Sequence, residues 1–146
     1  KPVQKPHPPV WFGARTEAAI KRAVIHGDGW MGPGSSSADD FAQHVGLIRR
    51  FLDETGRDSA TFPISKRVYL AIDDNPTRAE ERLRPWFAHT YGSADMANRV
   101  AIWGPQTQCL QEIESLVEAG AQHLMLNPVF DYDEHLEALQ VLVPDG

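Results

Sequence analysis

The chain has 146 residues, 42% of them hydrophobic and 23% charged, which is typical of a soluble globular domain with its own core. Its net charge of −6 argues against a nucleic-acid or anionic-membrane partner, because both need a basic surface. A single cysteine, Cys109, excludes internal disulfides and favours a reducing compartment, and we therefore expect a cytoplasmic protein without a membrane partner.

The first predicted elements follow a proline-rich start. Residues 1–9 are predicted to be an extended connector, because prolines exclude a helix or a central strand. Val10–Phe12 predicts a buried strand, and a helix capped by Thr16 follows it as far as Gly27. Gly29–Met31 predicts a second, very short strand.

A second and a third strand–helix unit are predicted next. Ser37 and Asp40 resemble a capping box at the start of a helix that ends before Gly56. The alternating run within Phe62–Ile72 predicts a strand, because it is rich in β-branched and aromatic residues. Asn75 then caps a helix, which we expect to break or kink at Pro85.

The last predicted unit is less regular. Val100–Trp103 predicts a strand that Gly104 and Pro105 cut short, and a helix over 106–118 places Val117 on its buried face. His123–Leu126 predicts a buried strand, and Asp133 can cap a final helix reaching Leu142. Strands that alternate with helices at this spacing indicate parallel α/β architecture in a single domain, residues 1–146, without an internal linker.

Several short motifs occur in one order along nearly the whole chain. They are Pro9–Ala14, Ala18–Ala19, Arg22–Ala23, His26–Met31, Gly56–Asp58, Phe62–Ser65, Glu118–Ala121 and Leu124–Pro128. Together they resemble the luciferase-like monooxygenase family, which includes flavin-dependent monooxygenases and deazaflavin-dependent oxidoreductases.

The resemblance implies a partial fold. It implies the C-terminal half, about four βα units, of a (β/α)8 TIM-type barrel, because such a barrel needs about 250 residues and eight strands to close. It further implies FMN or an F-420-type deazaflavin as coenzyme and a small-molecule substrate. The expected partner is the missing N-terminal half barrel or a second copy of this chain. We name no catalytic residue, since the missing half carries much of the substrate pocket in relatives.

Two predicted loops are candidates for binding the coenzyme phosphate. Their residues are Gly13, Ala14, Arg15 and Thr16 in the first loop, and Met31, Gly32 and Pro33, followed by Gly34 and Ser35, in the second. The first loop ends a strand and opens a helix, where backbone N–H groups, the helix dipole and an arginine can bind an anion. The second loop ends the next strand on the same side, and its serine hydroxyls could donate to phosphate or ribityl oxygens.

Each loop has a simpler interpretation. Gly13 could form a tight turn, Thr16 could only cap the helix, and Arg15 could be a solvated surface residue. The second loop could be a flexible connector. Ala14 stands where many relatives have a second glycine, and its methyl group puts the geometry of phosphate binding in doubt.

The remaining candidate residues have structural interpretations. Asp28 is expected to bond nearby backbone, Asn127 to form a turn or touch ligand, and Cys109 to pack in the core. Trp30 and Trp103 suit either a core or a pocket. The six histidines show no metal-ligand spacing, so no metal is expected.

Three functions remain open from the sequence. The leading hypothesis is an oxidoreductase or monooxygenase whose coenzyme performs the chemistry while the protein orients it. The second is a non-catalytic half barrel, either a fragment or a binding and interaction module. The third is a different phosphate-binding barrel enzyme, since one barrel fold hosts many activities.

Overall fold

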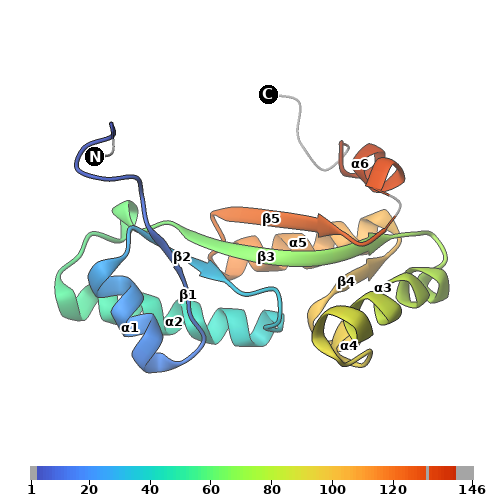
Figure 1. Ribbon diagram of the computed structural model, residues 1–146, viewed down its shortest axis with the longest axis horizontal. Coiled ribbons are helices and arrows are strands. Elements are labelled where there is room, and N and C mark those ends of the chain that lie inside the picture. Colours follow the sequence, from blue (N-terminus) through green and yellow to red (C-terminus); the bar gives the residue numbers. More distant parts are fainter. Residues whose placement is uncertain (1–2, 131, 141–146) are drawn as a thin grey trace.

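The computed structural model describes residues 3–130 and 132–140, which form one parallel five-stranded sheet with helices around it (Figure 1). In chain order the elements are β1 (Trp11–Gly13), α1 (Glu17–His26), β2 (Gly29–Gly32), α2 (Ala38–Thr55), a short 3-10 helix (Ser59–Thr61), β3 (Ile64–Ile72), α3 (Pro76–Tyr91), α4 (Met96–Val100), β4 (Ile102–Gly104), α5 (Gln106–Ala119), β5 (His123–Pro128) and α6 (Tyr132–Gln140). The predicted parallel α/β architecture is confirmed.

Side-chain caps begin three of the helices at the predicted residues. The Thr16 hydroxyl accepts a hydrogen bond from the first turn of α1. Ser37 and Asp40 form a reciprocal capping box at the start of α2. The Asn75 side chain accepts from the first turn of α3. These bonds satisfy N–H groups that have no partner within a helix, which is why the helices start at these residues.

The long strand β3 organises the sheet. One of its edges pairs with β5 from Ser65 to Leu70. Its other edge pairs with β2 over Ile64–Lys66 and with β4 over Leu70–Ile72. Since β1 pairs with β2, the strands β1, β2, β3 and β5 lie side by side, and β4 extends the carboxyl end of β3. Within the described residues, β1 and β5 are the outer strands of this row, as predicted.

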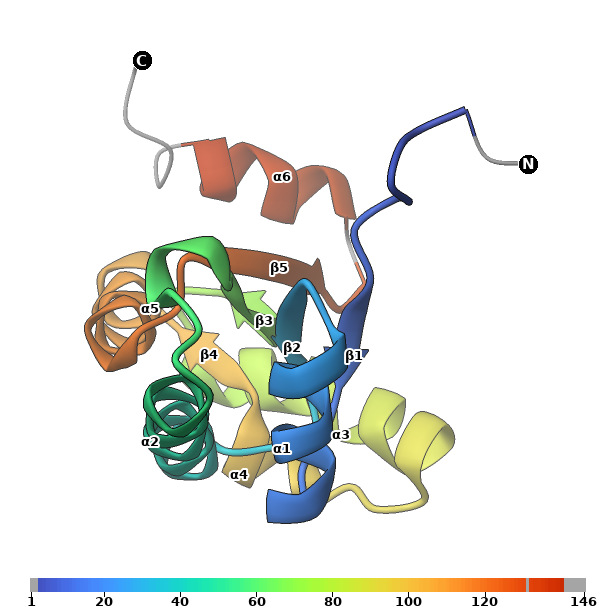
Figure 2. The ribbon, with the colours of Figure 1, turned by 90° about the vertical axis from the view of Figure 1, so that its left-hand side faces the viewer.

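The main core lies on the outer face of the sheet, the face toward α1, α2 and α5 (Figure 2). Alternation along the strands brings Trp30, Ile64, Val68 and Leu70 to this face, where all four are buried. They pack against the apolar sides of the three helices. The amphipathic patterns of these three helices are therefore used to cover this face.

The inner face of the sheet is the opposite one. Its residues are Trp11, Gly13, Gly29, Met31, Ser65, Arg67, Tyr69, Ala71, His123, Met125 and Asn127. On β5 this face is open, since Met125 is 45% exposed. At the carboxyl end of β3 it is covered, because Tyr69 and Ala71 are buried in a second core beneath α3 and α4.

Several sequence predictions are wrong or incomplete. The helix α3 does not break at Pro85 but continues to Tyr91, because Leu83 and Phe87 on either side of the proline are both buried in the second core. Val117 is 52% exposed, since α5 turns Cys109, Ile113 and Leu116 to the core instead.

The irregular fourth unit also differs from its prediction. A short helix, α4, precedes the strand, so β4 begins at Ile102 rather than at Val100. Asp133 lies within the first turn of α6, which starts at Tyr132. Leu142, the predicted end of the last helix, lies outside the described residues.

Candidate functional site

The two candidate phosphate loops lie at the same end of the sheet. Strands β1 and β2 are parallel, with Gly13 opposite Met31, and both loops follow the carboxyl ends of their strands. We call Gly13–Thr16 the first rim loop and Gly32–Ser36 the second rim loop. Their predicted position on one rim is confirmed, and it is the end at which parallel α/β barrels bind their ligands.

One hydrogen bond joins the rim loops directly, and a second ties the first rim loop to β2. The Arg15 guanidinium donates from Nη1 to Ser35 Oγ over 3.0 Å. Beneath it, the buried Trp30 indole donates from Nε1 to the Ala14 carbonyl oxygen over 3.1 Å. Trp30 is therefore a core residue that supports the rim, and Arg15 has a partner rather than being a free surface cation.

The first rim loop is accessible at three of its four residues. Gly13, Arg15 and Thr16 are exposed. A Cβ built on Gly13 would have nothing closer than the Met31 carbonyl oxygen at 4.0 Å, so the backbone is open to a ligand on this side. Ala14 is buried at 8% exposure and its φ lies outside the left-handed region, so its methyl group causes no backbone strain.

Positive groups lie at this rim beside one carboxylate. Glu17 in the first turn of α1 forms an ion pair with Arg50 of α2, which partly neutralises the carboxylate. The Arg15 guanidinium and the N-terminus of α1 are the positive groups that directly follow Gly13 in the first rim loop. An anionic group is the ligand that this arrangement favours.

Packing explains the glycines of the second rim loop. A Cβ on Gly32 would lie 3.0 Å from atoms of Phe41 and Trp30, and a Cβ on Gly34 would lie 2.5 Å from the Tyr69 ring. Both glycines are therefore needed for close packing, whatever the loop binds. Met31, just before the loop, lies on the inner face, and its sulfur accepts a hydrogen bond of 3.2 Å from the Ser65 hydroxyl.

Lys66 is a site residue that sequence reasoning missed. It lies on the outer face of β3 at 2% exposure, and its Nζ donates to the Pro33 carbonyl, the Ser36 carbonyl and the Ser36 hydroxyl at 2.7, 2.7 and 2.9 Å. Burial lowers the pKa of Lys66 to about 8, and the nearby Asp40 opposes this shift. The signal in the sequence was a lysine at an alternating core position of a strand.

The inner face carries one further polar pair. Arg67 donates from Nε to Asn127 Oδ1 over 2.5 Å, and its guanidinium lies 5.0 Å from the centre of the Tyr69 ring. The sequence interpretation of Asn127 as a turn former is therefore incomplete, because its side chain orients an arginine from the neighbouring strand.

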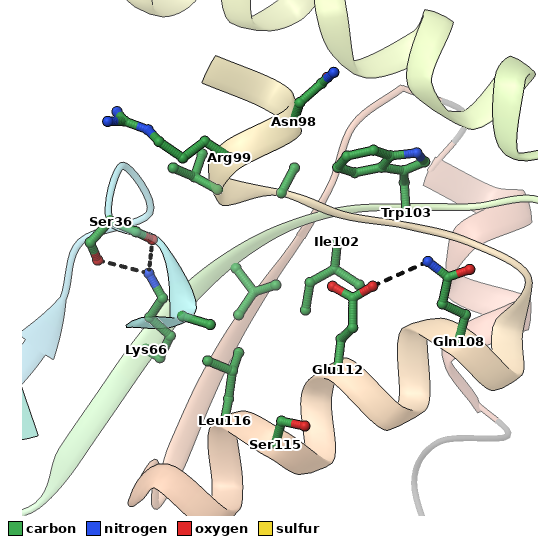
Figure 3. Close-up of a pocket in the computed structure, with 14 residues that line it drawn as sticks. Ser36, Lys66, Asn98, Arg99, Ile102, Trp103, Gln108, Glu112, Ser115 and Leu116 are labelled. Atoms are coloured by element: carbon green, nitrogen blue, oxygen red, sulfur yellow. Dashed lines mark hydrogen bonds between the residues drawn. The ribbon is translucent and has the colours of Figure 1, made fainter. Parts of the chain in front are cut away.

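A cavity of about 420 Å³ lies beside the rim, between the second rim loop, β3, α4, β4 and α5 (Figure 3). Trp103, Glu112 and Leu116 are among its lining residues, and Trp103 is also packed against the second core, so both positions considered for Trp103 apply. None of the seven nominated phosphate-site residues lines it. The cavity and the rim share one wall, formed by Ser36 and Lys66.

Two other nominated residues have structural positions. The Asp28 carboxylate accepts a hydrogen bond of 2.8 Å from the Val10 backbone at the amino end of the sheet, away from the rim. Cys109 is buried, and burial raises the pKa of its thiol to about 11, which suits packing rather than nucleophilic attack. No helix in the described part of the chain has the length and apolar character to cross a membrane.

Comparison with known families identifies the chain. The family model of the luciferase-like monooxygenases matches residues 1–94, which include both rim loops. This chain belongs to the luciferase-like monooxygenase family. No curated protein matches the chain.

Solved structures of other proteins show the same fold. An F420-dependent secondary alcohol dehydrogenase aligns with a TM-score of 0.82 at 16% identity, over 96% of this chain and 49% of that one. The coenzyme F420-dependent tetrahydromethanopterin reductase of Methanopyrus kandleri aligns with a TM-score of 0.72 at 18% identity, over 90% and 48%. A long-chain alkane monooxygenase aligns with a TM-score of 0.66 at 15% identity, over 89% and 38%.

These matches define the architecture. The chain spans about half the length of the F420-dependent enzymes that it matches, and its parallel strands with their helices correspond to part of a TIM-type barrel. The expected fold class, half of a (β/α)8 barrel, is confirmed.

Proposed function

We propose that this luciferase-like chain forms the coenzyme-phosphate side of a flavin- or deazaflavin-dependent oxidoreductase. The rim loops would hold the phosphate end of FMN or of an F-420-type coenzyme. Relatives in the same fold include F420-dependent enzymes and a monooxygenase, which supports a coenzyme of this kind.

The observation that carries the proposal is the meeting of Arg15 and Ser35 above the open backbone of Gly13. A guanidinium, a hydroxyl and a helix N-terminus converge where two parallel strands end. Each can donate a hydrogen bond to a phosphate oxygen, and the bonds from the guanidinium are charge-assisted. These donors have the chemistry that an anionic group requires.

The nominated residues divide into two roles under this proposal. Gly13, Arg15 and Thr16 contact the phosphate, since they are exposed. Ala14, Gly32 and Pro33 shape the loops, because the carbonyls of Ala14 and Pro33 already accept internal hydrogen bonds and Gly32 is packed against aromatic rings. Met31 reaches the inner face, where the coenzyme ring would lie.

The bound coenzyme would supply hydride or oxygen chemistry, and the protein would orient it and exclude water. A complete barrel is needed for this purpose. The outer strands β1 and β5 each lack a second neighbour among the described residues, and Met125 on the inner face is exposed. We propose that an N-terminal half barrel or a second copy of the chain covers this face and supplies the substrate pocket.

A binding titration tests the proposed function. The complete barrel, meaning this chain together with the half that closes it, is titrated with FMN and with the F-420-type coenzyme while coenzyme fluorescence is followed. We expect saturable binding of one of the two. Absence of binding for both would contradict the proposal and favour a non-catalytic interaction module.

A further inference from the structure

We infer that Lys66 is a positioning residue for the coenzyme site, because it holds the second rim loop in the shape that places Ser35 against Arg15. The inference rests on the proposed function of the rim. Lys66 itself would touch neither the coenzyme nor the substrate, since it lies on the outer face of the sheet.

The hydrogen bonds of Lys66 are complete within the protein. An ammonium group has three protons, and the Lys66 Nζ has three acceptors, one on Pro33 and two on Ser36, at 2.7–2.9 Å. The acceptors lie at the two ends of the segment from Pro33 to Ser36, which hydrogen bonds from the Ser36 N–H and hydroxyl to the Pro33 carbonyl close into a turn. Lys66 therefore fixes both ends of this turn to β3. The Ser36 carbonyl and hydroxyl are turned inward, and Ser36 is itself buried.

The position of Lys66 in the strand makes this arrangement unusual. Its neighbours on the same face of β3, Ile64 and Val68, are buried apolar residues of the core. Burying an ammonium group at such a position is unfavourable unless hydrogen bonds compensate for its lost hydration. An apolar side chain would fill the site without that cost, so the loop contacts are what the lysine adds.

The residues that Lys66 holds flank the proposed phosphate contact. Ser35 lies between the two residues that Lys66 holds, and its hydroxyl accepts the hydrogen bond from Arg15. On the inner face, Ser65, the neighbour of Lys66 in β3, bonds to Met31. The strand β3 therefore holds the end of β2 and the second rim loop from both faces of the sheet. Because this Gly- and Ser-rich loop is already ordered before the coenzyme binds, its ordering adds little entropy cost to binding.

Lys66→Met tests the inference in the complete barrel, because it keeps the aliphatic stem and removes the three donors. We expect the dissociation constant of the coenzyme that binds the wild type to rise by about ten- to a hundredfold, as expected for a misplaced binding group. We also expect faster exchange of the amide hydrogens of residues 34–36 without coenzyme, since Pro33 has no amide hydrogen. Ser36→Ala removes one of the three acceptors and also the 2.8 Å bond from the Ser36 hydroxyl to the Pro33 carbonyl. It is expected to show a smaller change of both kinds, because Lys66 keeps its two carbonyl acceptors, and Ser36→Thr is expected to restore the hydroxyl contacts.

Arg57→Met is the matched control. Arg57 also donates to backbone carbonyls, those of Val24 and Gly27, but it lies at the amino end of β2, away from the rim. It should lower the melting temperature and leave coenzyme affinity unchanged. The inference is overturned if Lys66→Met leaves the coenzyme affinity or the amide exchange of residues 34–36 at wild-type values, or if Lys66→Met and Arg57→Met weaken binding equally.

The two measurements, coenzyme affinity and amide hydrogen exchange, also separate this inference from the proposed function. A wild-type barrel that binds neither coenzyme refutes the proposed function and, with it, the role of Lys66 in coenzyme binding. Hydrogen exchange then still decides whether Lys66 orders the loop. If Lys66→Met does not fold, the graded pair Ser36→Ala and Ser36→Thr decides the inference by the same two measurements.

Discussion

Arg15 and Ser35 come from different strand ends, and the guanidinium Nη1 of the first donates to the hydroxyl oxygen of the second over 3.0 Å. This bond turns two short loops into one surface with a fixed cation. It also shows why neither loop could be judged alone from the sequence, since a solvated arginine and a flexible serine loop were the simpler interpretations of each.

Gly34→Ala is expected to destabilise the protein by about 1–3 kcal/mol, the usual cost of overpacking. The added methyl group would lie 2.5 Å from the Tyr69 ring, which is itself buried. Urea unfolding of both proteins measures the difference. The control is Gly46→Ala in α2, where nothing lies within 4 Å of the added Cβ.

Gly46→Ala is expected to stabilise the protein by about 0.5–1 kcal/mol, because alanine loses less backbone entropy than glycine within a helix. Equal effects of the two substitutions would mean that Gly34 is not packed against Tyr69 as described.

The stability of the protein should depend on pH through Lys66. Its pKa is about 8 in the folded protein and 10.5 in the unfolded chain, so between these values the unfolded chain holds more protons. The contribution of Lys66 to the unfolding free energy therefore rises with pH across this window and is lowest below about pH 8.

Two other groups lower the unfolding free energy as the pH rises, which is the opposite of the effect of Lys66. The pKa values of Cys109 and Tyr69 are raised, to about 11 and about 12, chiefly by burial. Comparison of the wild type with Lys66→Met cancels their effects. We expect the unfolding free energy of the wild type, relative to that of the variant, to rise from about pH 8 to 10.5. Parallel pH profiles for the two proteins would show that the Lys66 pKa is not lowered.

The 146-residue chain alone is expected to associate. The outer strands β1 and β5 have unpaired edges within the described residues, and exposed Met125 lies on the open inner face. Unpaired edges and exposed apolar surface favour association or aggregation. Sedimentation at several concentrations measures this. A stable monomer that unfolds cooperatively at low concentration would show that the half barrel needs no partner.

Much of the fold could be predicted because local signals and tertiary structure agree. Thr16, Ser37 and Asn75 cap helices in the structure as their side-chain chemistry indicates. Prediction failed where packing outweighed a local preference. Pro85 stays inside α3, since buried residues on both sides hold the helix against the second core.

The candidate site could be predicted only in outline. The parallel order of β1 and β2 was enough to place both rim loops at one end of the sheet. The contacts that join and hold them, from Arg15 to Ser35 and from Lys66 to Ser36, link residues 20 and 30 positions apart. No local pattern specifies such contacts, and Lys66 in particular interrupts the apolar face of its strand.

The central claim is that the rim binds the phosphate of the coenzyme, and a phosphate-specific comparison tests it most directly. The affinities of FMN and riboflavin, or of the F-420-type coenzyme and its phosphate-free form, are measured by fluorescence titration on the complete barrel and on its Arg15→Ala variant. Arg22→Ala, an exposed arginine further along α1, is the control. The substitution of Arg15 should weaken the binding of the phosphorylated ligand by about 1–3 kcal/mol and leave the binding of the phosphate-free ligand unchanged. Equal affinities for wild type and Arg15→Ala, or equal losses for both ligands, would contradict the claim.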